Sequence, residues 1–115
     1  MSLLKDRIPV CKHGTKENLD VGLLQTLGKL EKNLEEELDY TSGYRCPECN
    51  LKAGGVKNSA HLRGLGVDIR CHESHTRCKI IKGVVELGIR RFGIGKNIIH
   101  VDVDISLPQD VLWLY

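Results

Sequence analysis

The sequence predicts an α+β fold, in which a long N-terminal helix packs on a small, mostly antiparallel sheet. Three observations lead to this prediction. Leucines recur every three or four residues between Glu17 and Leu38, as on the buried face of a helix. Residues 76–87 repeat that period. The runs 89–94 and 98–105 have the composition of two strands joined by a tight turn.

The first helix is predicted over Glu17–Leu38. Asp20 or Asn18 is a suitable N-cap, because a short side-chain acceptor can bond the free amides of the first turn. The acidic run 35–37 lies at the end of the helix where the dipole disfavours acids, so we expect a solvated last turn. The apolar stripe consists of Leu19, Leu23, Leu27, Leu30, Leu34 and Leu38.

The middle of the chain is rich in turn residues. Residues 40–50 contain Ser42-Gly43 and Pro47, and further glycines continue to Gly66, interleaved with apolar and charged side chains. The predicted elements that follow are a strand at Val67–Arg70, a helix at Thr76–Leu87 that stops at Gly88, and strands at Ile89–Ile94 and Ile98–Ile105 joined by a turn at 95–97.

The composition excludes several classes of protein. A hydrophobic share of 41% and a charged share of 28% exclude a disordered or fibrous chain, and the length leads us to expect one domain over residues 1–115. Aromatic residues make up only 4%, which argues against a stacking platform, so we expect no nucleic-acid partner. Residues 41–100 carry 11 Lys and Arg against 4 Asp and Glu, which is most simply a solvated basic face.

The N-terminus carries no recognisable targeting signal. The first residues lack the apolar segment of a signal peptide, and no apolar run approaches the roughly 18 residues that span a bilayer. We therefore expect a protein without a membrane span that is cytoplasmic as synthesised, with its five cysteines reduced. We also expect a monomer.

Two histidines and an aspartate have the pattern of metal ligands. His61 and Asp68 lie seven residues apart across a glycine-rich turn, and His100 lies on the last predicted strand. Alternate residues of a strand share a face, so His100 is expected to project together with Asp102 and Asp104. Two imidazoles and one carboxylate suit Zn²⁺ and leave a fourth coordination position for water, as in hydrolytic zinc sites.

The order of residues around these ligands resembles the zinc D-Ala-D-Ala carboxypeptidases, which share a fold with lysostaphin-type peptidases and the hedgehog N-terminal domain. The family pattern Ser-x-His-x-x-Gly-x-Ala-x-Asp, followed by His-x-Asp, is matched over 59–68, apart from the alanine, and at His100 and Asp102. The similarity extends over nearly the whole chain, through Cys11-Lys12-His13-Gly14, Thr41-Ser42-Gly43-Tyr44-Arg45, Asn50, Gly54-Gly55, Trp113 and Tyr115.

The resemblance implies a zinc metallopeptidase that hydrolyses peptide bonds of bacterial cell-wall peptidoglycan. It would be a D-Ala-D-Ala carboxypeptidase, or an endolysin-type peptidase of a phage or prophage that reaches the wall through a lysis system or in the virion. The family pattern implies that Zn²⁺ is held by His61, Asp68 and His100. Arg45 would bind the terminal carboxylate of the stem peptide, and Ser59 would hydrogen-bond to the substrate.

Two positions depart from the family pattern. Gly66 replaces the alanine, and Asn97 stands three residues before the last zinc histidine, where several relatives carry the general base. An amide cannot accept the proton that such a base removes. Asp102, the nearest carboxylate on the His100 face, is our candidate base. The alternative is that Asp102 only orients His100.

The cysteines support a rival interpretation. Cys46 and Cys49 have the spacing of a zinc-binding pair, and together with Cys71 and Cys78 they would form a structural zinc module. In an oxidising exterior, a Cys46–Cys49 or Cys71–Cys78 disulfide is the alternative. A third hypothesis, kept open by Asn97, is a non-catalytic binding domain that retains the zinc-containing fold.

Overall fold

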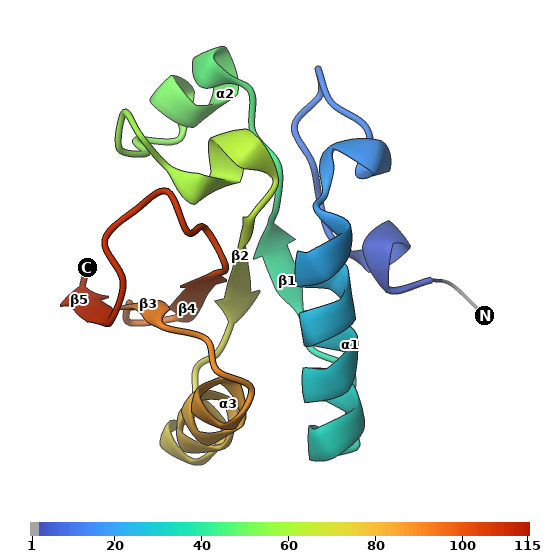
Figure 1. The fold of residues 1–115 in the computed structure, drawn as a ribbon, viewed down its shortest axis with the longest axis vertical. Helices are drawn as coiled ribbons and strands as arrows, with labels where there is room; N and C mark the ends of the chain where they lie inside the picture. The colour runs from blue at the N-terminus through green and yellow to red at the C-terminus, as the bar shows by residue number, and fades with distance from the viewer. Residues whose placement is uncertain (1–2) are drawn as a thin grey trace.

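The computed structural model describes residues 3–115 and confirms the predicted α+β class (Figure 1). Within these residues, three α-helices and five strands are joined by loops and by three short 3₁₀ helices. The α-helices are α1 (Val21–Leu34), α2 (Pro47–Lys52) and α3 (Ser74–Glu86), and the 3₁₀ helices are η1 (Leu4–Arg7), η2 (Lys16–Asn18) and η3 (Ala60–Arg63). The strands are β1 (Tyr40–Ser42), β2 (Gly66–Arg70), β3 (Arg91–Ile94), β4 (Ile98–Asp102) and β5 (Val111–Leu114).

The strands of the described chain form one sheet with the order β1-β2-β4-β3-β5. Each neighbouring pair is antiparallel except β3 and β5, which run parallel. The prediction of a mostly antiparallel sheet is therefore confirmed. Strand β4 lies in the middle, and its register with β2 places His100 directly opposite Asp68.

The two faces of the sheet differ in polarity. On one face, strands β2 and β4 carry fully buried side chains that pack with α1 and α3 in the hydrophobic core. These are Val67, Ile69, Ile99 and Val101. Because side chains alternate along a strand, the residues between them point to the opposite face. That second face carries Asp68, His100 and Asp102. Helix η3, which contacts β2, and helix α2 lie at the end of β2 away from α3 (Figure 1).

Helix α1 is shorter than the leucine stripe predicted. It begins after Asp20, whose carboxylate accepts a hydrogen bond from the amide of Leu23 (2.9 Å) as the N-cap. It ends before Glu35, which takes the left-handed conformation with φ of 55°. Leu19 and Leu38 lie in the loops that flank the helix, and their side chains are buried in the core. The stripe overestimates the helix because a core position does not require helical backbone.

Among the α-helices and strands of residues 3–115, three lie outside the predicted elements. Strand β1 and helix α2 lie within residues 40–52, a segment for which only turn-rich composition was noted. Pro47 is the first residue of α2, a position where its missing N–H is tolerated. Strand β5 extends the sheet by pairing with β3 and places Trp113 opposite Gly93. Because parallel partners are not joined by a hairpin, the sequence carries no local signal for this pairing.

Several predicted boundaries also shift. The last predicted strand ends at Asp102, so Asp104 does not share the sheet face predicted for it. Its carboxylate is instead buried and accepts a hydrogen bond from Nε of Arg63 (2.6 Å). Strand β3 begins at Arg91, two residues later than predicted. The predicted stop of α3 is confirmed, since Gly88 follows the helix with φ of 81°.

The turn after η3 requires the glycine at position 64. Gly64 is the C-cap of η3 with φ of 68°, and a Cβ there would overlap the carbonyl oxygen of Asn18. Gly64→Ala is therefore expected to lower the free energy of unfolding by more than about 1–2 kcal/mol, the cost of the left-handed backbone alone. Urea denaturation measures this loss. Gly28→Ala is the matched control. Gly28 lies within α1, and a Cβ there would have no atom within 4 Å, so this substitution should stabilise the helix. Equal stabilities of the two variants would contradict the prediction.

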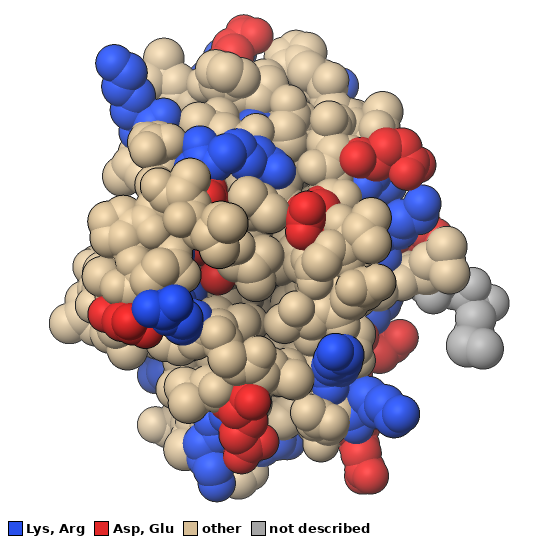
Figure 2. All heavy atoms as spheres, in the orientation of Figure 1, with Lys and Arg blue, Asp and Glu red and all other residues tan. Residues whose placement is uncertain are grey.

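The surface carries charges of both signs. On the face seen in Figure 2, Lys and Arg alternate with Asp and Glu and form no large patch of one sign. Two basic residues of the segment 41–100 form exposed ion pairs with acids outside it. Arg90 pairs with Asp110 (2.6 Å), and Lys79 pairs with Glu36 (3.4 Å). Such exposed pairs are typical of a solvated surface. None of the helices within residues 3–115 is long and apolar enough to cross a bilayer.

Candidate functional site

Two histidines turn toward one carboxylate oxygen on the polar face of the sheet. His61 Nε2 lies 3.3 Å and His100 Nδ1 lies 2.9 Å from Oδ1 of Asp68. One ligand atom from each of the three side chains lies within 4.8 Å of the others, and all three residues are buried. Helix η3 supplies His61, β2 supplies Asp68 and β4 supplies His100. The fold thus brings together the three side chains predicted as ligands.

The far nitrogens of the two rings are held by hydrogen-bond acceptors. His61 Nδ1–H donates to the carbonyl of Gly43 (2.6 Å), and His100 Nε2–H donates to Oδ2 of Asp102 (2.7 Å). Because each far nitrogen is held by an acceptor, the near nitrogen is the one that faces Asp68 and is left to bind a metal ion. Two imidazole nitrogens and a carboxylate oxygen within 4.8 Å of one another are a ligand set that fits Zn²⁺.

The contacts of Asp68 and His100 set their ionisation. Burial by itself would raise the pKa of Asp68, but hydrogen bonds from His100 and His61 outweigh it and hold that pKa well below its usual range. Burial by itself would lower the pKa of His100, but hydrogen bonds to Asp102 and Asp68 outweigh it and raise that pKa. Asp68 is therefore a carboxylate at neutral pH, the form that binds a metal ion.

The three side chains line a pocket of about 670 Å³. Arg45, Ser59 and Asp102 line the same pocket, so the predicted site residues meet in one place. Other parts of the wall come from the loop after α2 and from the C-terminal segment; they include Ala53, Gly54, Gly55, Val56, Leu107, Pro108, Val111, Trp113 and Tyr115.

Arg45 is held in a fixed position in this pocket. Its Nε donates to Oγ of Ser42 (3.2 Å), its Nη1 to Oδ1 of Asn50 (3.3 Å) and its Nη2 to Oδ2 of Asp68 (3.4 Å). Asn50 is buried and is anchored in turn to a backbone carbonyl (2.8 Å), while a Cβ at Gly55 would overlap its side chain. Asn50 and Gly55 therefore place the guanidinium beside the cluster of candidate metal ligands.

Ser59 forms part of the support for His61. Its Oγ accepts a hydrogen bond from the backbone N–H of His61 (3.2 Å) and caps η3. Ser59 is buried and lines the pocket. Binding of a substrate, the role implied by the resemblance, would use the same hydroxyl.

Asp102 is enclosed by its hydrogen-bond partners. The residue is 1% exposed, and its Oδ2 accepts from His100. Its Oδ1 accepts from Nε of Arg91 (2.7 Å) and from the amide of Asp104 (3.2 Å). The carboxylate therefore contacts the side of the His100 ring that is turned away from Asp68. These contacts favour the orienting alternative for Asp102 over the role of general base.

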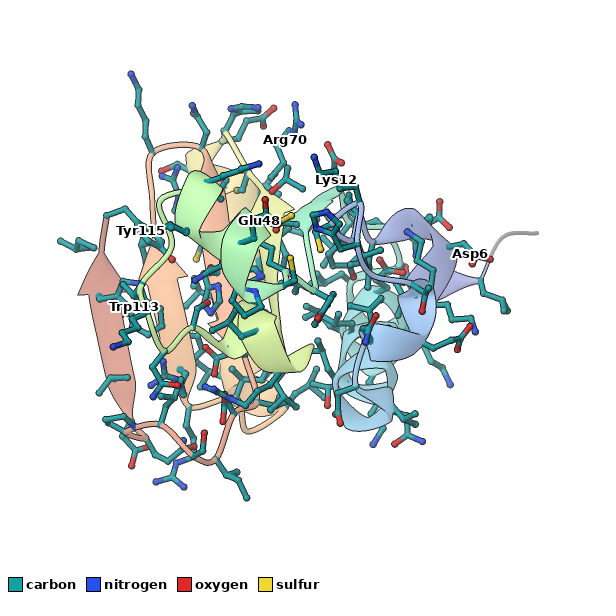
Figure 3. All side chains as sticks on the ribbon, turned by 90° about the horizontal axis from the view of Figure 1, so that it is seen from above. Asp6, Lys12, Glu48, Arg70, Trp113 and Tyr115 are labelled. Carbon is teal, nitrogen blue, oxygen red and sulfur yellow. The ribbon has the colours of Figure 1, made fainter. Side chains whose placement is uncertain are left out.

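Arg91 lines the pocket and was not among the site residues predicted from the sequence. It lies opposite Asp102 in the pairing of β3 with β4, and its guanidinium carbon lies 5.1 Å from the ring centroid of Trp113. Trp113 projects from β5 (Figure 3), and its ring centroid is 5.5 Å from that of His100. Counting outward from the predicted turn at 95–97 would have paired Arg91 with Val101, whereas the observed register is shifted by one residue and pairs Arg91 with Asp102. The predicted hairpin therefore did not reveal this contact.

The family of the chain follows from its sequence profile. A family model described as Peptidase M15 matches residues 2–104. The chain belongs to the Peptidase M15 family. No curated protein matches the sequence. Membership confirms the resemblance to the zinc D-Ala-D-Ala carboxypeptidases and supports a zinc metallopeptidase that acts on peptidoglycan-type substrates.

This M15 site has no carboxylate at position 97, where several relatives carry the general base. Asn97 lies next to the start of β4, and its Oδ1 lies 3.1 Å from Nδ1 of His72, outside the pocket wall described above. Among the pocket-lining residues of 3–115, the carboxylates are Asp68 and Asp102. Both are already bonded to the histidines.

The cysteines of this M15 chain are not grouped as the zinc-module interpretation predicted, with Cys46 and Cys49 beside Cys71 and Cys78. Cys46 and Cys49 lie with Cys11 and His13. The other two cysteines lie elsewhere: Cys71 packs in the hydrophobic core, and Cys78 is exposed on α3. Every cysteine within residues 3–115 is a free thiol in the structure, so neither anticipated disulfide is formed.

Proposed function

We propose that this M15 peptidase removes the C-terminal residue of a peptidoglycan stem peptide, as a D-Ala-D-Ala carboxypeptidase does. Arg45 carries the proposal, because its fixed guanidinium lines the same pocket as the His61, Asp68 and His100 cluster. A planar guanidinium pairs with a carboxylate through two parallel hydrogen bonds. A peptide whose terminal carboxylate meets Arg45 would present its last peptide bond to that cluster.

We assign the zinc ion to Nε2 of His61, Nδ1 of His100 and the carboxylate of Asp68. The two imidazole nitrogens that face the ionised carboxylate of Asp68 support this assignment. When bound, zinc supplies Lewis-acid activation of the scissile carbonyl and of the attacking water. The hydroxyl of Ser59, at the start of η3, would hold the substrate by a hydrogen bond.

We assign Asp102 to the orientation of His100. Its burial, and its bond to the far nitrogen of the ring, support this role. A general base must reach the reacting proton directly or through one water, and the carboxylate of Asp102 is already occupied by Arg91 and His100.

Digestion of purified muropeptides by the zinc-loaded protein, followed by mass spectrometry, tests the proposal. Loss of the terminal residue alone is the result expected of a carboxypeptidase. Cleavage within the stem would instead indicate an endopeptidase of the phage or prophage endolysin type. The absence of hydrolysis at full zinc occupancy would favour the non-catalytic binding domain.

Arg45→Lys should harm substrate use more than folding. Lysine keeps the positive charge but loses the planar fork that binds a carboxylate through two hydrogen bonds. Because a charge-assisted hydrogen bond is worth about 1.5–3 kcal/mol, kcat/KM on a peptide with a free C-terminus should fall by about 10-fold or more. Steady-state kinetics on a synthetic stem peptide measures the change.

The matched control for this prediction is Arg70→Lys, an exposed arginine on β2 that pairs with Asp39 outside the pocket. It should leave kcat/KM unchanged. An amidated peptide should be a poor substrate for the wild-type protein, since it lacks the carboxylate that Arg45 would bind. Equal turnover of the amidated and free peptides would show that Arg45 does not recognise that carboxylate.

A further inference from the structure

Three cysteines and a histidine converge at a second place, and none of the four is among the residues that line the pocket. Cys11 and His13 come from the loop before η2, and Cys46 and Cys49 come from the start of α2. One ligand atom from each of the four lies within 4.8 Å of the others. Figure 3 shows sulfur atoms gathered between the labelled side chains of Lys12 and Glu48.

The distances within this group fit a tetrahedral ion. His13 Nδ1 lies 3.4 Å from Sγ of Cys46 and 3.4 Å from Sγ of Cys49. A tetrahedron with Zn–S bonds of about 2.3 Å and Zn–N bonds of about 2.0 Å has edges of about 3.5–3.8 Å between ligand atoms. The two measured distances are close to such edges, and all the ligand atoms lie within 4.8 Å of one another, so small side-chain shifts would seat one zinc ion.

The chemistry of the group favours zinc over other occupants. Three thiolates and one imidazole are a common ligand set for structural zinc, and Cys-x-x-Cys at 46–49 is the spacing of a chelating pair. Backbone amides also support negative sulfurs, because the N–H of Cys46 donates to Sγ of Cys11 (3.3 Å) and the N–H of Cys49 to Sγ of Cys46 (3.5 Å). Four protein ligands close the coordination sphere, so the ion would be structural and not catalytic.

The backbone around the group explains what such an ion would hold in place. The loop that carries Cys11 is joined to the end of β1 by two hydrogen bonds, from Cys11 N to the carbonyl of Tyr44 (3.0 Å) and from Gly43 N to the carbonyl of Pro9 (2.8 Å). Gly43 also accepts the hydrogen bond of His61, and Cys46 directly follows Arg45. An ion at the cysteines would fasten the backbone on both sides of Arg45.

We propose that Cys11, His13, Cys46 and Cys49 form a second, structural zinc site that ties the N-terminal loop to the start of α2. This site is separate from the pocket cluster of His61, Asp68 and His100. It also differs from the cysteine module predicted from the sequence, because its second pair of ligands comes from the N-terminal loop.

Metal analysis of the reduced protein, together with Co²⁺ substitution, tests the second site. The wild-type protein should bind two zinc ions per chain. The cobalt protein should show the strong near-ultraviolet absorption of thiolate-to-cobalt charge transfer, which the pocket cluster cannot produce because it has no sulfur. Cys49→Ser should lose one ion per chain and most of that absorption. Cys78→Ser, an exposed cysteine outside the group, is the matched control and should keep both.

His61→Ala separates this inference from the proposed function. It should lose the pocket ion and retain the thiolate–cobalt absorption. A wild-type cobalt protein without that absorption would overturn the second site, and this measurement needs no variant that folds. A Cys49→Ser protein with unchanged metal content and absorption would overturn it as well. So would a disulfide among these cysteines that persists in the reduced, metal-treated protein.

Discussion

His61→Ala is expected to remove the zinc ion of the pocket and to reduce peptide hydrolysis to the level of the metal-free protein. The variant keeps only two of the three proposed ligands, too few for tight binding of a catalytic zinc ion. The fold should persist, because the hydrophobic core packs on the other face of the sheet. The carbonyl of Gly43 loses its donor, at a cost of about 1–3 kcal/mol in unfolding free energy.

Metal analysis and mass spectrometry of the digested peptide measure the two losses, and circular dichroism checks the fold. His75→Ala is the matched control, since this histidine is exposed on α3 and should retain full zinc content and activity. Undiminished zinc and activity in His61→Ala would exclude the pocket as the catalytic centre. Activity that disappears only in Cys46 or Cys49 variants would move the centre to the cysteine group.

Asp102→Asn is expected to weaken zinc binding in the pocket by about 10–100-fold while leaving kcat at saturating zinc close to the wild-type value. The amide keeps the shape of the carboxylate but no longer fixes the proton on Nε2 of His100. The near nitrogen, Nδ1, is then left without a proton and able to bind zinc for only part of the time. A competitive zinc titration and steady-state kinetics on the same variant give the two quantities.

Arg91→Gln is the control for Asp102→Asn, because it breaks the same buried ion pair with Asp102 (2.7 Å) without changing the bond to His100. Its stability should fall, while its zinc affinity should change less than that of Asp102→Asn. The opposite pattern for Asp102→Asn, unchanged zinc affinity with kcat lowered by about 10²–10⁴-fold, would restore Asp102 as the general base.

The part of the site carried by β2 and β4 was predictable from the sequence. Strand residues alternate between two faces, so His100 and Asp102 had to share one face while Ile99 and Val101 filled the core. The glycine turn at 64 was also visible, because a motif that brings His61 back to Asp68 needs a residue that tolerates positive φ. These inferences needed only local geometry.

The remaining features depend on contacts between distant segments, which local patterns do not encode. The spacing in the sequence grouped Cys46 and Cys49 with Cys71 and Cys78. In the structure, hydrogen bonds between the N-terminal loop and the end of β1 place Cys11 and His13 beside Cys46 and Cys49 instead. The role of Asp102 depends on its partner Arg91, which belongs to another strand. Helix α1 was overestimated because loop leucines, such as Leu38, enter the same core.

The direct pairing of Asp68 with His100 links metal binding to the alignment of the sheet. A slip of β2 against β4 by one residue would turn one of these strands over, so that its ligand entered the core and its apolar neighbour entered the pocket. Strands β3 and β4 are joined by a short turn, whereas β2 can pair with β4 only after the long connection through α3 has closed. We therefore expect the pocket to form late in folding. Zinc that binds only the aligned sheet would lower the population of slipped pairings by mass action.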